Sequence, residues 1–405
     1  MRVAYYSPLP PSPSGIAAYS ALLLPALRRH VDVVVARPGR LRRAPKADIC
    51  LYHVGNDPEA HGWIVASLHR RPGVVVLHEL AIHHLVAGIT LARGDAAGYL
   101  DAMERCHGLV GRLLAYAVLD NRIPPLWETR PHDFPLAGEV LRYATGVVVH
   151  SRYVEEGARQ AGYDGPIWRV PHPAWPDLEV EPASIDGSPI IGCFGHLNEA
   201  KRLPQLYAAF ERVRARWSQA RLLVVGRASP GAADPPPPPG VAREGYVEEG
   251  RLWSLMAACD LVVSLRAPTM GETSGTVMRA LSLGKPLVVS DVGWFSELPD
   301  EVAVKVPVDE HEVEALALAL DQLAADGRRR EAMAAAARRL AETEHALERV
   351  AELYAAALEE AAGGRVVREA VVSELAQAAA EIGLGPDDPE TRELGQRARE
   401  VGLGG

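Results

Sequence analysis

Short apolar segments alternate with helical segments along this chain, in two successive series. Apolar runs with the length of buried strands occupy residues 1–6, 31–36, 49–53, 74–78, 147–150 and 167–171, then 190–194, 222–225, 243–247 and 261–265. Most of the longer segments between them carry apolar residues at helical spacing. Alternating strands and helices predict parallel sheets covered by helices, so the expected fold class is α/β with two Rossmann-like, doubly wound domains.

A change of composition separates the two series. Residues 173–188 are rich in proline, aspartate and glutamate and show no periodicity, which marks a linker. We therefore expect a first domain over 1–175, a second over 188–335, a helix over 336–362 that returns toward the first domain, and a tail over 363–405 with two more helices, the last capped by Asp388-Pro389. Two such domains facing each other form a cleft, the usual place for a ligand.

Composition limits the class of protein. Of the 405 residues, 48% are apolar and 23% charged, as in globular proteins, and the net charge of −9 argues against a dedicated nucleic-acid binder. The four cysteines form no CxxC pair, which favours buried, reduced thiols. No signal peptide precedes the first strand and no apolar run is long enough to span a membrane, so we expect a cytoplasmic protein.

One region of the first series is clearly basic. Its positive residues, with Asp32 as the acidic residue among them, are Arg28, Arg29, Arg37, Arg40, Arg42, Arg43 and Lys46. A solvated arginine face would explain this 28–46 region. Contact with an anionic membrane surface or with an acidic acceptor would explain it too, and would place the protein peripherally at the inner membrane face.

The stretch 261–300 carries the strongest functional signal. A strand ends there in a loop with a lone carboxylate, Glu272, and the small residues Thr273, Ser274 and Gly275 then open a helix. The first turn of a helix offers unpaired N–H groups and a positive dipole end, which suit a phosphate. A carboxylate beside it suits the hydroxyl donors of a sugar. Phosphate and sugar side by side indicate a nucleotide-sugar.

Polar residues also follow strands of the first series. The strand 1–6 runs into a proline-rich loop that ends at Ser14-Gly15 before a helix; this loop lacks the GxGxxG pattern, so a stiff connection explains it as well as a ligand site does. His78, at the end of a strand, fits a polar contact in a cleft or a hydrogen-bonded structural histidine. His83 and His84 are adjacent and cannot both face one ion from a helix, and no complete zinc set is visible, so no metal is expected.

Taken in order, these motifs resemble those of GT-B-fold glycosyltransferases of family four, retaining enzymes that use nucleotide-sugars. The resemblance extends over residues 1–362 and is strongest over 190–300. On the acceptor side it implies roles for Ser14, Gly15, Ile16 and Tyr19. The donor-binding residues that it implies are Gly195, His196, Gly226, Tyr246, Val247, Thr273, Ser274, Gly275, Thr276 and Arg279. The catalytic residues that it implies are His78, Lys201, Arg202 and Glu272.

The chain departs from the family pattern at two positions. His196 stands where an arginine usually follows the glycine of the phosphate loop, so the cationic role is expected to pass to Lys201 and Arg202. The second glutamate of the family's E-x7-E motif, which holds the ribose, is missing, and Arg279-Ala280 occupies its place. The ribose contact is therefore expected to differ.

The resemblance implies a metal-independent, retaining transfer from a nucleotide-diphosphate sugar to a hydroxyl acceptor on a glycan, a glycolipid or a small molecule, with no cofactor. No Asp-x-Asp sequence is present to hold a metal, and cations with helix N–H groups can stabilise the departing diphosphate instead. Glu272 would orient the sugar and His78 would contact it. Two other functions remain open: a GT-B nucleotide-sugar epimerase, and a non-catalytic binding or scaffold protein.

Overall fold

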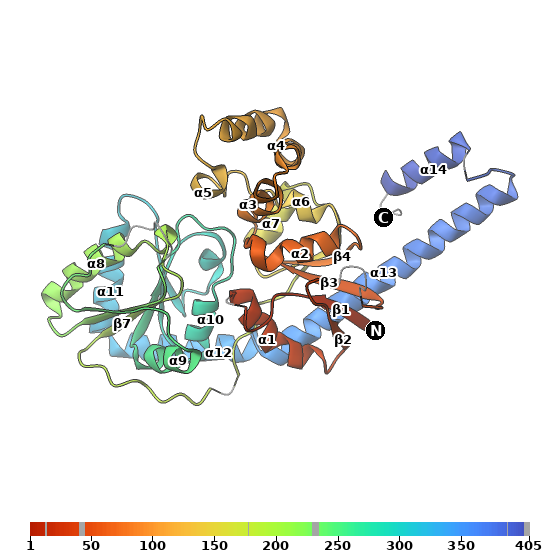
Figure 1. The fold of residues 1–405 in the computed structure, drawn as a ribbon. Helices are drawn as coiled ribbons and strands as arrows, with labels where there is room; N and C mark the ends of the chain where they lie inside the picture. Colours follow the sequence, from red (N-terminus) through yellow and green to blue (C-terminus); the bar gives the residue numbers. More distant parts are fainter. Residues whose placement is uncertain (13, 40–44, 177, 229–234, 387, 401–405) are drawn as a thin grey trace.

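The computed structural model describes residues 1–405 apart from 13, 40–44, 177, 229–234, 387 and 401–405, and contains two six-stranded sheets (Figure 1). The first sheet consists of β1 (Arg2–Tyr6), β2 (Asp32–Val35), β3 (Ile49–Val54), β4 (Gly73–Leu77), β5 (Ala144–Val149) and β6 (Ile167–Arg169). The second consists of β7 (Ile190–Phe194), β8 (Arg221–Val225), β9 (Val241–Glu244), β10 (Leu261–Ser264), β11 (Leu287–Ser290) and β12 (Ala303–Val306). The expected α/β class with two Rossmann-like sheets is confirmed.

In the first sheet the strand order is β2-β1-β3-β4-β5-β6, with parallel pairing throughout. Every residue of β3 and β4 is buried, because helices cover both faces of the sheet, and this explains why these strands are continuous apolar runs. The chain reverses direction across the sheet between β1 and β3, a position where doubly wound folds bind ligands. The helices of this domain are α1 (Gly15–Leu27), α2 (Pro58–Leu68), α3 (His83–Thr90), η2 (Leu91–Arg93), α4 (Ala96–Leu119), α5 (Leu126–Thr129), α6 (Gly138–Leu141) and α7 (Arg152–Gln160).

In the second sheet the order is β12-β11-β10-β7-β8-β9, so the reversal lies between β7 and β10. The extended segment expected over 243–247 begins and ends earlier, as β9, because its pairing with β8 finishes at Glu244. Tyr246 and Val247 therefore lie in the loop beyond the strand. The helices of this domain are η3 (Glu199–Lys201), α8 (Leu203–Arg216), α9 (Glu249–Ala258), α10 (Gly275–Ser282), η4 (Gly293–Glu297), α11 (Glu312–Ala325) and α12 (Gly327–Thr343).

After α12 the chain returns to the first domain. Helix α12 packs on α10, whereas α13 (Leu347–Glu381) packs on α1. Tyr354 of α13 is fully buried there, with its hydroxyl 2.7 Å from that of Tyr19. Figure 1 shows α13 as one long helix that passes the first sheet and extends beyond it. The C-terminal helix thus contributes to the core of the N-terminal domain.

The tail differs from the sequence-based expectation at its first helix. The first of the two expected tail helices does not begin as a separate helix after residue 362, because α13 continues unbroken from Leu347 to Glu381. A glycine inside a helix costs only about 1 kcal/mol relative to alanine, and the buried Val350, Tyr354 and Leu358 anchor the preceding turns. The last helix, α14 (Pro389–Glu400), follows Asp388 as predicted.

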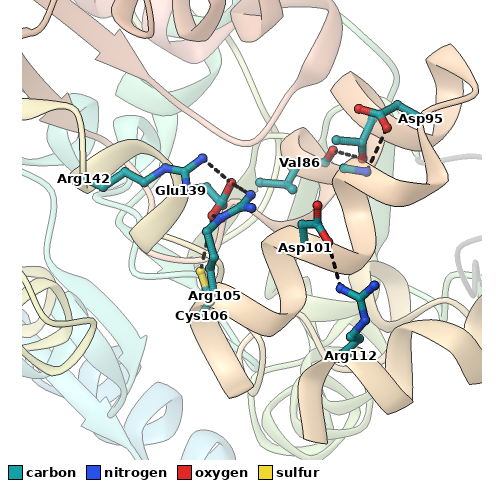
Figure 2. A network of polar contacts seen from close by, with 10 residues as sticks. Val86, Asp95, Asp101, Arg105, Cys106, Arg112, Glu139 and Arg142 are labelled. Carbon is teal, nitrogen blue, oxygen red and sulfur yellow. Dashed lines mark hydrogen bonds and ion pairs between the residues drawn. The ribbon is translucent and has the colours of Figure 1, made fainter. Parts of the chain in front are cut away.

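Helix α4 bends in its middle. Gly108 has φ 63° and ψ −161°, which no helix contains, and the second half folds back so that Arg112 reaches Asp101 at 2.8 Å (Figure 2). Arg105 in the first half is 2.8 Å from Glu139 of α6, and Arg142 is 3.1 Å from the same carboxylate. The ion pair of Arg105 with Glu139 holds the first half of α4 against α6, so we assign Glu139 a structural role.

Two sets of hydrogen bonds join the domains. The N–H groups of Leu80 and Ala81, after β4, donate to the carbonyl of Met270, after β10, at 2.8 and 3.0 Å. The carboxylate of Glu297 accepts from the N–H groups of Arg152 and Tyr153 at 3.0 and 2.8 Å. These N–H groups belong to the first turn of α7, where a helix provides no internal partner. The loops that follow β4 and β10 therefore meet at one place.

Candidate functional site

The loop after β7 forms a compact turn at the reversal point of the second sheet. Gly195 has φ 106° and Gly226 has φ 154°, and a Cβ added to Gly226 would overlap the carbonyl oxygen of Gly195. Only glycine fits at Gly226, because both the left-handed conformation and the close approach exclude a side chain. A Cβ on Gly195 would lie 3.1 Å from Thr276 Oγ1 and 3.6 Å from Lys201 Nζ. Three of the predicted donor-binding positions are thus brought together.

Lys201 supplies the positive charge of this turn. Its side chain is 2% exposed, and Nζ donates to the carbonyl of Phe194 at 3.0 Å. The pKa of Lys201 is lowered to about 8, mainly by burial and in part by the charge of Arg266; Cys193 and Glu272 oppose this shift. The ammonium therefore keeps its proton at neutral pH while being largely shielded from water, which strengthens its interaction with an anion.

Arg202 is placed differently from Lys201. It has φ 55°, and its guanidinium pairs with the carboxylate of Glu312 at 3.0–3.1 Å through Nε. The Glu312 side chain is 2% exposed, so it depends on this partner to be buried as a charge. The structure therefore gives Arg202 a structural contact that the sequence did not predict.

Arg266 is a further cation that sequence analysis missed. It follows β10, its backbone N–H donates to Ser290 Oγ at 2.9 Å, and its Nε is 2.7 Å from the carboxylate of Glu272. The next residue, Ala267, donates its N–H to the carbonyl of Ala200 at 2.9 Å, so Arg266 lies beside the turn of Gly195, Gly226 and Lys201, hereafter the phosphate turn. The charge of Arg266 lowers the pKa values of both Lys201 and His196. Its position shortly after the strand in the stretch 261–300 could have identified it from the sequence.

The start of α10 has the form expected of an anion site. Ser274 is its N-cap, with its hydroxyl accepting from the N–H of Val277 at 3.3 Å. Thr276, in the first turn, donates its hydroxyl to the carbonyl of Phe194 at 3.4 Å, which links α10 to the turn of Gly195 and Lys201. Thr273 and Gly275 flank the cap. The positive end of the helix dipole and the Lys201 ammonium thus lie beside the same turn.

Glu272 is held in its loop by two hydrogen bonds and one ion pair. Its carboxylate accepts from Thr269 Oγ1 at 3.1 Å and from the N–H of Met270 at 2.8 Å, both through Oε2, and Oε1 pairs with Arg266. A carboxylate has about four acceptor positions, so the two hydrogen bonds occupy about half of them. The rest are available to a hydroxyl.

Arg279 lies one turn farther along α10, and its Nη1 donates to the carbonyl of Gly275 at 3.3 Å. Its guanidinium stacks over Trp175 at 4.2 Å and Trp253 at 5.5 Å, and it pairs with Glu249 at 3.1 Å. Burial lowers the pKa of Arg279, and Glu249 opposes this shift. These contacts hold Arg279 between α9, the start of α10 and the linker.

His78 ends β4 next to the interface between the domains. It is 8% exposed, and its Nε2 is 2.9 Å from Nδ1 of His53. His53 Nε2 is buried without a partner among the described residues. A buried N–H without an acceptor costs more than a lone pair without a donor, so His53 carries its proton on Nδ1 and donates it to His78. His78 then carries its own proton on Nδ1.

His78 belongs to a layer of buried aromatic rings under the carboxyl edge of the first sheet. The ring of Tyr19 touches those of four histidines, with centroid distances of 4.8–5.8 Å to His53, His78, His150 and His172. Burial lowers the pKa of all four histidines, and that of His150 falls to about 4. These rings are therefore neutral at pH 7.

The layer predicts acid-dependent stability. The unfolded chain binds protons at its histidines below about pH 6.5, whereas the folded chain does not until the pH approaches 4 for His150. The free energy of unfolding should therefore fall as the pH drops through this range. Replacing His150 with Asn keeps a donor for the carbonyl of Val170, 2.8 Å away, and removes one titrating group.

Urea denaturation at several pH values tests this prediction. Between pH 6.5 and 4.5, His150→Asn should lose stability less steeply than wild type, by up to about 1.4 kcal/mol per pH unit, the equivalent of one proton. Equal slopes for the two proteins would contradict the neutral state of His150.

The predicted acceptor-side residues divide into two groups. Ser14 caps α1 by accepting from the N–H of Ile16 at 3.2 Å, and Gly15 is exposed, with open space where a Cβ would be. Tyr19, by contrast, is 2% exposed and bonded to Tyr354. Tyr19 therefore supports the histidine layer from within the core.

Three other predicted donor-binding residues, His196, Tyr246 and Val247, lie in the loops that follow β7 and β9. Tyr246 is 69% exposed, with Arg227 6.0 Å above its ring, and Val247 packs against the core of the domain. His196 is partly buried, and burial followed by the charge of Arg227 lowers its pKa. An exposed aromatic face beside a cation leaves a surface on which a planar base can stack.

Glu79 is a second carboxylate at the domain interface, and sequence analysis missed its role. Burial raises the pKa of Glu79 to about 7, and the negative charge of Glu272 adds to this effect. The two segments that hold them, 78–80 and 270–272, are the ones joined by the hydrogen bond from Leu80 to Met270. The structure therefore brings the predicted His78 and Glu272 segments together across the interface.

One group of side chains among the described residues has the spacing to hold a metal ion. The His, Cys, Asp and Glu side chains close enough to share an ion are His30, Glu348 and Glu352, all exposed and outside this site. Among the described helices, none is both long and apolar enough to cross a membrane.

Comparisons with known proteins agree with this geometry. A family model described as Glycosyl transferases group 1 matches residues 188–326, the part of the chain that contains the phosphate turn, Glu272 and α10. No curated protein matches the chain significantly in sequence. Residues 188–326 are thus similar to a glycosyl transferases group 1 domain.

Solved structures share the fold of the whole chain. HepE from Anabaena, in complex with UDP and glucose, is 17% identical with a TM-score of 0.59, over 89% of this chain and 100% of that one. Sucrose-phosphate synthase from Thermosynechococcus elongatus is 16% identical with a TM-score of 0.60, over 92% and 100%. AviGT4, a glycosyltransferase involved in avilamycin A biosynthesis, is 15% identical with a TM-score of 0.52, over 90% and 98%. The chain therefore has the two-domain GT-B fold of glycosyltransferases.

Proposed function

We propose that this glycosyltransferase moves a sugar from a nucleotide-diphosphate sugar to a hydroxyl acceptor, with retention of anomeric configuration and without a metal. The observation that carries the proposal is the meeting of the Lys201 ammonium, the Gly195–Gly226 turn and the N-terminus of α10 at the reversal point between β7 and β10. Such reversal points are where doubly wound domains bind nucleotides. Both UDP and glucose occupy the related HepE structure, which supports a nucleotide-sugar as donor.

The chemical requirement is to stabilise a diphosphate that gains negative charge as it leaves. Lys201 and Arg266 provide two cations beside the phosphate turn, and α10 adds the positive end of its dipole. In the proposed step the bond between the sugar's anomeric carbon and the diphosphate oxygen breaks. The acceptor oxygen bonds to the same face of that carbon, and its proton passes to the departing phosphate oxygen. No protein base is then required.

The two residues at the domain interface would orient the sugar. Glu272 would accept a hydrogen bond from a sugar hydroxyl through the part of its carboxylate that the loop leaves free. His78, neutral and protonated on Nδ1, would donate to a sugar oxygen. A neutral ring suits this role, because a further fixed cation beside Lys201 and Arg266 would favour the free diphosphate product as much as the transition state.

A donor panel tests the proposed function directly. The protein is heated with nucleoside diphosphates and their sugars, and a bound ligand should raise the melting temperature further as its concentration exceeds its Kd. The nucleotide-sugar that raises the melting temperature is then incubated with the protein, and release of its nucleoside diphosphate should require a hydroxyl acceptor. Conversion of the donor alone would instead indicate an epimerase, and stabilisation without turnover for any acceptor would indicate a binding protein.

The Glu272→Gln variant tests the sugar-orienting role. We expect kcat to fall roughly tenfold, as for loss of one charged hydrogen bond, while the Kd of the free nucleoside diphosphate stays within about twofold because that ligand lacks the sugar. Glu314→Gln is the control, since Glu314 pairs with Arg212 at 2.7 Å on the outside of the same domain. Unchanged kcat for Glu272→Gln would refute the assignment.

A further inference from the structure

A large cavity lies at the carboxyl edge of β1 and β2 in the first domain, separate from the phosphate turn of the second. Its volume is about 1030 Å³, and its wall includes the loop before α1, the start of α2 and the end of η2. Trp63 of α2 and several prolines and alanines make part of the wall apolar. The loop before α1 is the one that ends at Ser14 and Gly15, so the cavity adjoins the predicted acceptor side.

Three exposed arginines from separate elements line this cavity. Arg28 is the C-cap of α1, Arg37 follows β2, and Arg93 ends η2. None of the three side chains makes a hydrogen bond or ion pair with another described residue. The guanidinium of Arg93 lies against α2, where a Cβ on Gly62 would be 3.3 Å from its Nη2.

The positive charge of the cavity is therefore only partly compensated. Glu59 is the only carboxylate in its described wall, so three positive charges face one negative charge. The neighbouring Arg29 shows the contrast, because it points elsewhere and pairs with Glu348 of α13. The positive charges of the three arginines repel each other across the cavity, and an anion bound between them reduces that repulsion.

We propose that this cavity binds a phosphate group carried by the acceptor substrate. A phosphate presents oxygens in three directions and up to two negative charges, which fits guanidinium groups arriving from three elements; a single carboxylate is planar and satisfied by fewer. The volume exceeds that of a phosphate alone, and the apolar wall beside Trp63 accommodates the adjoining part of the acceptor. The inference rests on the proposed transferase function and narrows its acceptor class.

The proposal assigns a role to two arginines of the basic 28–46 region. Arg28 and Arg37 belong to the cavity, and Arg29 belongs to the contact with α13. Arg40, Arg42 and Arg43 lie outside the described residues. The acidic-acceptor interpretation of this region thus gains a specific site.

Calorimetric titration of the full chain with hexyl phosphate and with uncharged hexyl glucoside tests the site. We expect hexyl phosphate to bind at least tenfold more tightly than the glucoside, and Arg28→Gln, Arg37→Gln and Arg93→Gln each to weaken it at least fivefold. Arg70→Gln is the matched control, because Arg70 is an exposed arginine near the amino end of β4, outside the cavity. It should change the affinity by less than twofold.

Nucleoside diphosphate binding is measured on the same variants, to separate this proposal from the proposed function. The three cavity variants should keep that affinity within twofold, since the donor site lies in the other domain. The triple variant combines Arg28→Gln, Arg37→Gln and Arg93→Gln in one chain. Equal hexyl phosphate binding by wild type and this triple variant would overturn the proposal whether or not the protein proves to be a transferase. An equal effect of Arg70→Gln would also overturn it, because it would show unspecific attraction.

Vesicles distinguish a lipid-borne phosphate from a soluble one. If the acceptor is a lipid, wild-type protein should sediment with phosphatidylglycerol vesicles but not with phosphatidylcholine vesicles, and the triple variant should lose this binding. If the acceptor is soluble, hexyl phosphate should bind without sedimentation. Vesicle binding that persists in the triple variant, together with unchanged hexyl phosphate binding, would refute the site.

Discussion

Replacing Lys201 with Met should lower kcat at least about 100-fold, the loss found when one preorganised charge-stabilising donor is removed from an active site. Methionine fills nearly the same buried space, so the turn around Gly195 should keep its shape. The ammonium interacts most strongly with the diphosphate as its charge develops. For that reason kcat and kcat/KM should fall together.

Lys285→Met is the matched control for this variant. Lys285 is also partly buried in the second domain and also donates to backbone carbonyls, those of Ala257 and Cys259 at 2.6 and 2.7 Å, but it precedes β11 and so lies at the opposite edge of the sheet. Its loss should reduce stability and leave kcat within about threefold. Steady-state kinetics with the donor from the panel measure both variants. Similar kcat values for Lys201→Met and wild type would show that Lys201 does not stabilise the departing diphosphate.

The pH profile provides an independent check on Lys201. Because burial lowers its pKa to about 8, the free enzyme loses this positive charge as the pH rises above that value. The wild-type kcat/KM, which reports groups of the free enzyme, should therefore decline on the alkaline side. In Lys201→Met this decline should disappear from the residual activity.

Most of the strands were predictable because parallel strands buried on both faces leave a continuous apolar run in the sequence. Their order in the two sheets was not predicted. The site segments were predictable for a related reason: Gly195, Glu272 and Ser274 each follow a strand of the second sheet, and carboxyl ends of parallel strands share one edge. Local sequence thus specified which loops meet. It did not specify which side chains pair within them.

Pairings over long sequence distances were not predictable. The contact of Arg202 with Glu312 spans 110 residues, and that of Tyr19 with Tyr354 spans 335. Each depends on how helices pack after the sheet has formed, and nothing in the local spacing of charges or aromatic residues encodes it. These two contacts turn one predicted catalytic residue and one predicted acceptor residue toward structural partners.

Glu79 was missed for a similar reason. Its sequence neighbours marked it only as a polar residue after a strand, whereas its raised pKa arises from burial and from Glu272 in the other domain. Such an effect exists only once the two domains are in contact. The same holds for Arg266, whose partner Glu272 is near in sequence but whose influence on Lys201 and His196 requires the fold.

Gly226→Ala should destabilise the protein by about 3 kcal/mol, combining the strain of a left-handed alanine with overpacking against backbone. The added Cβ would overlap the Gly195 carbonyl, and neither residue can move freely: Gly226 N–H donates to Glu244 and Gly195 N–H donates to Val225, both at 3.0 Å. Relief therefore requires breaking a sheet hydrogen bond beside the phosphate turn. Nucleoside diphosphate affinity should fall along with stability, at least about tenfold, because the displaced turn carries the groups that face the phosphates.

Gly250→Ala provides the comparison, since Gly250 lies in α9 with open space around the added Cβ. Alanine is the better helix former by about 1 kcal/mol, so this variant should be as stable as wild type or more stable and should bind nucleotide equally well. Urea denaturation and nucleotide titration of the two variants separate a general effect of adding a methyl group from the specific constraint at Gly226. If Gly226→Ala kept both stability and affinity, the turn would be adaptable, and the close approach of Gly195 and Gly226 could not be what shapes the donor site.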